Sequence, residues 1–264
     1  MLVEFFWIIL FTFLISSLVK EWSGFGSISF AMSFLIAFLG FAKADAVTIV
    51  ISVNVFMNAA ILVENKKFNI KSLDNIKVMV ILGVIFTFVG QYFLKNPDYD
   101  IAVKIIAGSL IVLAGINKLI VMKYGRKELF KEATMHKYYI PAGIISGLFN
   151  GIAGLGGLPA LIMLSNSDLP RDKFRTTLVS YFFVMNIVAI VGFFINRSYT
   201  PFVLQNIGVF VIPSVIVCMF GVYLSRRVSD RIFSYVMLGV MFFMGINLVI
   251  NGITGQNILN FLFL

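Results

Sequence analysis

Two glycine-containing turns interrupt apolar segments of the chain, and their chemistry suits the binding of an anion. The first turn is Ser-Gly-Phe-Gly-Ser at 23–27, and the second is Ala-Gly-Leu-Gly-Gly at 153–157. A helix that starts after such a turn leaves its first backbone N–H groups without partners, and these donors and the helix dipole favour negative charge. The alternative is that the glycines only let helices pack closely. The candidate binding residues are Gly24, Gly26, Ser27, Gly154, Gly156 and Gly157.

Polar residues inside apolar segments form a second group of binding candidates. Asn54 and Asn58 are four residues apart, and therefore lie on one face of a helix. Asn186 and Thr176 occupy a later apolar segment. Neutral amides and hydroxyls can donate to an anion without holding it too tightly, but such groups also bond helices to each other in membranes. Arg175 either attracts an anion or marks the membrane boundary.

Three charged residues are candidates for coupling transport to an ion. Lys20 and Glu21 lie beside the first turn, and charges at membrane depth are costly and therefore typically functional. The alternative for this pair is an ion pair in a wetter vestibule. Asp45 begins an apolar segment and is expected at the interface. A proton and sodium both stay open as the coupling ion.

The sequence offers little for catalysis, metal binding or nucleic-acid binding. It has one histidine, His136, and one cysteine, Cys218, with no His and Glu at metal-ligand spacing and no Gly-x-Ser-x-Gly motif. We therefore predict no catalytic residues, no metal, no cofactor and no enzymatic activity. The formal net charge of +9 is concentrated between apolar segments, which indicates membrane topology rather than a nucleic-acid surface.

Composition and segment length predict an all-α polytopic membrane protein. Of the 264 residues, 60% are hydrophobic and 12% are charged, about half the charged share of soluble domains. Six apolar runs are long enough to span a bilayer: 44–63, 76–94, 100–122, 174–195, 202–224 and 231–251. Two pairs of shorter runs flank the glycine turns: 3–19 with 26–41, and 139–152 with 155–167.

The second pair of short runs predicts a re-entrant helical hairpin. Its arms of 13–14 residues would reach about 20 Å, which is too short to cross the membrane. The first pair is longer, so it either spans or re-enters.

Lysine and arginine are distributed unevenly among the loops. Sixteen fall in regions predicted to share one side: 64–77, 118–137, 168–175 and 225–231. The opposite side receives four: Lys43, Lys95, Lys104 and Arg197. By the positive-inside rule the first side is cytoplasmic. We therefore expect a multi-pass protein of the cell (inner) membrane with both termini outside.

The two halves of the chain resemble each other. The segment SVNVFMN at 52–58 matches SYFFVMN at 180–186, GIN at 115–117 matches GIN at 245–247, and the glycine turns and a Gly-x-Tyr motif also recur, at offsets of 128 to 131 residues. We predict a first repeat at 1–122, a cytoplasmic linker at 123–138 and a second repeat at 139–264. Each repeat would contain a hairpin and three transmembrane helices. This odd number of helical pieces predicts inverted repeats, which typically bind substrate near the midplane at broken helices.

These motifs together resemble the sulfite/sulfonate exporter family, TauE/SafE. The resemblance is carried by GIAGLGGLP at 151–159, RTTL at 175–178 and Gly-Phe-Gly at 24–26, and both halves follow the family's order. The first turn departs from the pattern, with Ser27 where a glycine is expected and no proline after it. The resemblance implies a secondary transporter of sulfite, sulfonates or related organic anions. A passive anion channel, a non-sulfur carboxylate substrate and a homodimer stay open.

Overall fold

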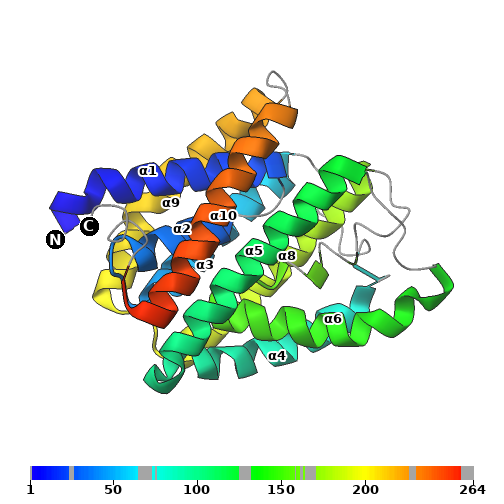
Figure 1. The fold of residues 1–264 in the computed structure, drawn as a ribbon, viewed down its shortest axis with the longest axis horizontal. Helices are drawn as coiled ribbons and strands as arrows, with labels where there is room; N and C mark the ends of the chain where they lie inside the picture. Colours follow the sequence, from blue (N-terminus) through cyan, green and yellow to red (C-terminus); the bar gives the residue numbers. More distant parts are fainter. Residues whose placement is uncertain are drawn as a thin grey trace.

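The computed structural model describes residues 2–23, 27–64, 73–74, 76–124, 132–157, 159–160, 163, 171–225 and 230–256. Every regular element in these ranges is helical (Figure 1), which confirms the predicted fold class at this level. The helices are α1 (Leu2–Ser23), α2 (Ser27–Ala37), α3 (Lys43–Glu64), α4 (Lys77–Lys95), α5 (Asp100–Tyr124), α6 (Glu132–Ala153), α8 (Arg171–Ile195), α9 (Pro201–Ser225) and α10 (Asp230–Thr254), with a short 3-10 helix, η2, at Pro97–Tyr99.

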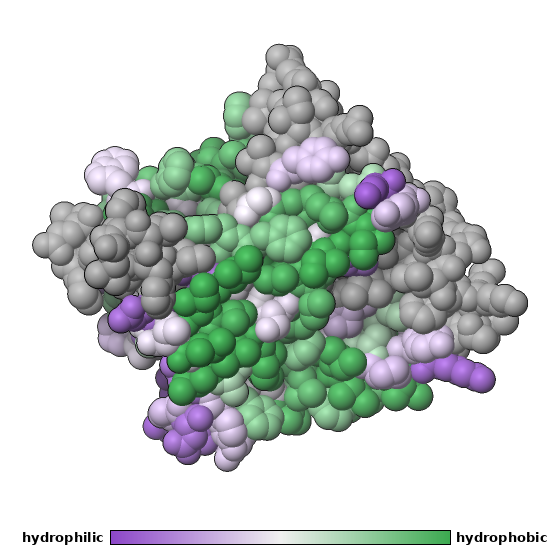
Figure 2. Space-filling model, viewed as in Figure 1, coloured by the Kyte–Doolittle hydropathy of each residue, from purple (hydrophilic) through white to green (hydrophobic). Residues whose placement is uncertain are grey.

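Five of the predicted membrane spans are confirmed by length and apolarity. Within the described residues these spans are Lys43–Val63, Lys77–Lys95, Pro97–Tyr124, Thr176–Ile195 and Pro201–Gly221. Their outer faces are apolar: on α9, Ile212, Ile216 and Phe220 follow one another at four-residue spacing and are each more than half exposed. Figure 2 shows apolar side chains over much of the face that carries α5 and α10. Such a surface is stable in contact with lipid and not with water.

The arms of the two hairpins differ from the predicted lengths. Helix α6 runs over 22 residues, so it is longer than the predicted 14-residue apolar arm, but it is not among the five described helices that are long and apolar enough to cross the membrane. The prediction started at the first apolar residue, whereas the helix begins seven residues earlier in a polar stretch. In the first hairpin, α1 has 22 residues and α2 has 11. At about 16 Å, α2 alone cannot cross the membrane.

Helices from the two halves of the chain pack against each other. Helix α4 packs along α6, α1 along α9 and α5 along α10, while α3 contacts both α8 and α9, and α8 contacts α4. In Figure 1, α1 and α9 lie along the upper edge, α4 and α6 along the lower edge, and α5 and α10 cross the front. Because all of these contacts join elements before residue 125 to elements after residue 131, the two halves form one membrane unit.

Glycines bring α4 and α6 into close contact. A Cβ built on Gly147 would lie 2.5 Å from the Gly83 carbonyl oxygen, and one on Gly151 would lie 2.1 Å from the Thr87 carbonyl oxygen. The contacting positions advance in the same order along α4 and α6, so these two helices run parallel. Small residues allow this backbone approach, which replaces the missing hydrophobic driving force between helices in lipid. The α1–α9 contact uses aromatic rings instead, with the rings of Phe13 and Phe210 stacked at a centroid distance of 5.4 Å.

Replacing Gly151 by alanine is therefore expected to destabilise the protein. The added methyl group must push α6 away from α4, because it meets backbone atoms that cannot rotate aside. A matched control is Gly208→Ala on α9, where a Cβ meets nothing within 4 Å of the described atoms. Thermal unfolding in detergent should show a lower Tm for Gly151→Ala and an unchanged or higher Tm for Gly208→Ala. Equal Tm values would contradict close packing of α4 and α6.

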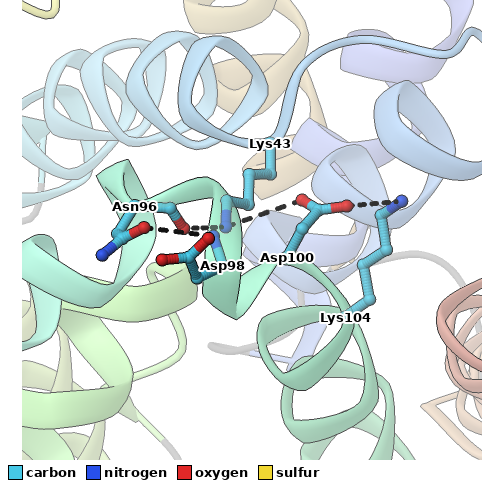
Figure 3. Close-up of polar contacts among 5 residues, drawn as sticks. All are labelled: Lys43, Asn96, Asp98, Asp100 and Lys104. Carbon is cyan, nitrogen blue, oxygen red and sulfur yellow. Dashed lines mark hydrogen bonds and ion pairs between the residues drawn. The ribbon is translucent and has the colours of Figure 1, made fainter.

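A polar cluster ties together one end of the helix bundle (Figure 3). The Lys43 ammonium donates to the Asn96 carbonyl oxygen at 3.1 Å and lies 3.6 Å from the Asp100 carboxylate, which also pairs with Lys104 at 3.1 Å. Lys95 donates to the carbonyl oxygen of Asn196, the residue before Arg197. The four positive residues assigned to one side by the sequence thus lie at one end of the bundle.

Candidate functional site

The second glycine turn lies directly against the start of helix α2. Gly154 ends α6 with a φ of 68°, its N–H donates to the Asn150 carbonyl at 2.9 Å, and the next N–H donates to the Phe149 carbonyl at 3.0 Å. A left-handed glycine is the common way to end a helix. A Cβ built on Gly154 would lie 2.9 Å from Ile28 Cγ2 and 3.0 Å from Ile51 Cδ1. Because Ile28 is the second residue of α2, the C-terminal end of α6 in the second hairpin lies against the start of α2 in the first hairpin.

This meeting point lies near the middle of two membrane spans. Ile51 and Asn54 are central in the span of α3, and Phe182 lies in the middle of α8. The Asn54 amide donates to the Ser27 hydroxyl at 2.8 Å, which fixes the start of α2 against α3. On the second turn, a Cβ on Gly157 would lie 2.0 Å from the Phe182 ring. The structure therefore brings Ser27, Asn54, Gly154 and Gly157 together.

Several buried polar atoms near this point have no hydrogen-bond partner within the described part of the chain. The unpartnered atoms are both amide atoms of Asn58, which is fully buried, Nδ2 of Asn186 and the hydroxyl of Ser180. An unsatisfied buried polar group costs about 1–3 kcal/mol. Such groups in a native structure indicate a ligand or water that completes their hydrogen bonds.

The second hairpin satisfies its own polar groups. Ser146 donates to the Gly156 carbonyl oxygen, and its hydroxyl also bonds that of Tyr181, which is fully buried. The Asn150 amide donates to the Met185 carbonyl oxygen at 3.0 Å. A Cβ on Gly156 would lie 2.6 Å from the Asn150 Cβ, so Gly156 is needed for this packing. Sequence reasoning missed Ser146, Asn150 and Tyr181, although the four-residue spacing of Ser146 and Asn150 marks one polar helix face.

The remaining predicted site residues fall into two groups. Gly24 and Gly26 lie outside the described residues, as do the side chains of Lys20, Glu21 and Arg175, whose backbones belong to α1 and α8. Asp45 is half-buried in the first turn of α3, and Thr176 is half-buried near the start of α8. Asp45 lies six residues before Ile51, and Thr176 lies six residues before Phe182, so each is about 9 Å along its helix from the residue that meets a glycine turn. The structure thus separates these two from the meeting point of the turns.

Polar contacts also connect the two halves between the meeting point and the Lys43 end. The Ser52 hydroxyl on α3 bonds the Tyr199 hydroxyl at 3.1 Å, and the Tyr199 ring lies 4.3 Å from that of Phe194. Burial raises the pKa of Tyr199, so this phenol stays neutral. The Gln91 amide on α4 donates to the Ala189 carbonyl of α8 at 2.7 Å. These bonds hold α4 to the last turns of α8, and α3 to the loop that follows α8.

The described residues contain no metal-binding group, since no three of their His, Cys, Asp and Glu side chains come together. The arrangement instead offers amides, hydroxyls and a helix start, which are groups that can bind anions.

Comparison with known proteins identifies one family. The model of the sulfite exporter TauE/SafE family matches residues 8–248, which include both hairpins and nearly all the described helices. No curated protein and no solved structure matches the chain. The family consists of membrane transporters and not of enzymes, in agreement with the absence of a catalytic motif from the sequence. With five membrane-length helices among its described residues and a family match over most of its length, this multi-pass membrane protein belongs to the sulfite exporter TauE/SafE family of transporters.

Proposed function

We propose that this protein is a secondary transporter that moves sulfite, sulfonates or related small anions by alternating access around a site between its two hairpins. The observation that carries the proposal is the contact of Gly154 with Ile28 and Ile51 near the middle of the spans. Asn58, with an amide that lacks partners among the described residues, lies two turns along α3 from this contact. A site in this position can be opened to either side by relative motion of the two halves.

The packing supports the proposed inverted repeats at 1–122 and 139–264. If α1 to α5 correspond to α6 to α10, the contact of α4 with α6 should have a counterpart between α9 and α1, and both occur. The contact of α3 with α9 likewise has its counterpart between α8 and α4. The helices leave only 125–131 between α5 and α6, within the proposed linker at 123–138.

The chemistry of the polar groups supports a small oxyanion as the substrate. Neutral donors on α3 and α8, together with the first N–H groups of α2, can surround three oxygens without a permanent ion pair. A sulfite or sulfonate group presents such oxygens, and so does a carboxylate. The choice of sulfur rests on the family alone.

Flux measurements in proteoliposomes test this function. We expect sulfite, sulfoacetate or taurine to accumulate against its own gradient when a proton or sodium gradient is imposed. Movement that only follows the anion's own gradient would instead identify a passive channel. Uptake of simple carboxylates but not of sulfur anions would overturn the proposed substrate class.

Ion coupling is assigned in this proposal to Asp45, with Lys20 and Glu21 as further candidates. Asp45 has the carboxylate chemistry for proton uptake, and it lies in the first turn of α3. Asp45→Asn should abolish proton-driven accumulation while anion exchange between the two sides continues. Unchanged proton-driven uptake would exclude Asp45 as the coupling residue.

The uneven distribution of lysine and arginine supports an external position for the Lys43 end of the bundle and for both termini. Gln256, at the end of α10, is exposed, whereas the only cysteine, Cys218, is buried. A cysteine introduced as Gln256→Cys should therefore react with a membrane-impermeant maleimide added to intact cells. Reaction only after the membrane is permeabilised would place this end inside.

Mass measurement of the detergent-solubilised protein tests the proposed homodimer.

A further inference from the structure

The helices pack in two groups that do not coincide with the two halves of the chain. Helices α4, α6 and α8 contact one another, and we call them the α4 group. Helices α1, α2, α3 and α9 form the α9 group, in which α1 and α3 both pack along α9 (Figure 1). Because the close glycine contacts of α4 with α6 lie inside one group, a motion that opens the site is expected to occur between the groups.

The two groups are closed against each other at the Lys43 end of the bundle. Every residue of α3 from Ala46 to Asn54 is buried, so protein surrounds the helix from near this end to the meeting point of the hairpins. The Ser52 hydroxyl on α3 bonds that of Tyr199, whose ring packs on Phe194 of α8. The described residues therefore leave no water-filled path along this stretch of α3.

Lys43 makes the outermost contact between the groups (Figure 3). It is the first residue of α3, and its ammonium reaches the segment that follows α4, where it donates to the Asn96 carbonyl oxygen at 3.1 Å and lies 3.6 Å from Asp100. The helix dipole disfavours a positive charge at a helix N-terminus, so the stability of α3 alone does not account for a lysine here. Lys43 is 8% exposed, and these two partners compensate for its removal from water.

Asp100 can lose Lys43 without being left unpaired. Its second carboxylate oxygen lies 3.1 Å from the Lys104 ammonium, one turn along α5, and its side chain is 41% exposed. A carboxylate that keeps one partner and contacts water loses little when the other partner departs. The Lys43 contact can therefore open and close, in contrast to the contact of α4 with α6, where a glycine backbone lies against a helix backbone.

We propose that Lys43 and Asp100 form a gate at this end of the protein, and that the gate is closed in this structure. Opening moves the start of α3, with the α9 group, away from the α4 group. Lys43 then exchanges Asp100 and the Asn96 carbonyl for water, while the carboxylate stays with Lys104. The gate rests on the proposed transport function, since it controls access to the site between the hairpins from one side of the membrane.

A cysteine placed behind the gate tests the proposal without any substrate. Thr48 is fully buried between Lys43 and the meeting point of the hairpins, and its hydroxyl donates to the Ala44 carbonyl within the same helix. With Cys218 replaced by alanine, the Thr48→Cys protein should react slowly with a membrane-impermeant maleimide. Adding Lys43→Met should raise the labelling rate at least tenfold when the reagent is on the side of the Lys43 end.

Further variants separate a gate from a merely structural ion pair. Asp100→Asn should raise labelling as Lys43→Met does. Lys104→Met is the matched control, because it removes a partner of the same carboxylate within one helix, and it should not raise the rate more than twofold. Loosened packing would raise labelling equally from both sides of the membrane, whereas an opened gate raises it from one side only.

The gate is overturned if Lys43→Met and Asp100→Asn leave the labelling rate unchanged, if Lys104→Met raises it as much, or if it rises equally from both sides. A cleavable bis-maleimide that joins Lys43→Cys to Asp100→Cys should stop sulfite uptake, and cleavage of the linker should restore it. Uptake that continues through the linked protein would also overturn the gate. Labelling as expected in a protein that neither binds nor transports sulfite would overturn the proposed function and leave the gate standing.

Discussion

Replacing Gly154 by valine is expected to abolish anion transport while the protein still inserts in the membrane. The φ of 68° is unfavourable for any residue with a Cβ, at a cost of about 1–2 kcal/mol. The side chain would also press on Ile28 and Ile51, the two residues that bring the first hairpin and α3 to this point. Separation of the hairpins should destroy the site that they enclose, so uptake into proteoliposomes should fall by at least 100-fold.

A control separates this effect from general misfolding. Gly40 also has a positive φ, of 66°, but a Cβ there meets nothing within 4 Å of the described atoms. Gly40→Val carries the same backbone strain without the contact, and it should retain most of the uptake. If the two variants lose activity equally, backbone strain explains the loss and the contact between hairpins is not required.

Replacing Gly157 by alanine is expected to reduce transport at least tenfold, and the additional replacement of Phe182 by alanine should restore it. A methyl group cannot occupy a position 2.0 Å from an aromatic carbon, so the Phe182 ring must leave its place in the middle of α8. The displaced ring would then disturb the neighbouring site. Initial uptake rates of the single and double variants, normalised to inserted protein, measure the effect.

The double variant Gly157→Ala with Phe182→Ala gives the new methyl group the space that the ring occupied. Its rate should exceed that of Gly157→Ala, and Phe182→Ala alone provides the baseline. A double variant no faster than Gly157→Ala would mean that Gly157 is needed for its backbone approach to the substrate and not for the ring.

The corresponding contact in the first half is chemically different. In the proposed repeat register Ser27 corresponds to Gly157 and Asn54 to Phe182, and Ser27 and Asn54 form a hydrogen bond of 2.8 Å instead of a glycine–ring contact. In the proposed repeats this contact is therefore polar in one half and apolar in the other. This difference explains why a site between the proposed repeats need not be symmetric.

The sequence alone determined the membrane character and the positions of five spans. Apolar run length depends only on neighbouring residues, so five spans were predicted within a few positions of their observed ends. The same method placed the start of α6 seven residues too late, because a helix satisfies its own backbone hydrogen bonds and can continue into polar residues such as those from Glu132 onward. The hydropathy of a segment indicates which residues can lie in the hydrocarbon core, and it does not indicate at which residue the helix begins.

Only the tertiary structure decided which polar residues are already satisfied. Asn58 and Asn150 look alike in the sequence, as polar residues in apolar helices, yet Asn150 donates to Met185 whereas the Asn58 amide has no partner among the described residues. This difference depends on which side chains the neighbouring helices present at one height. That information lies in contacts between residues far apart in the chain, and hydropathy and local spacing do not contain it.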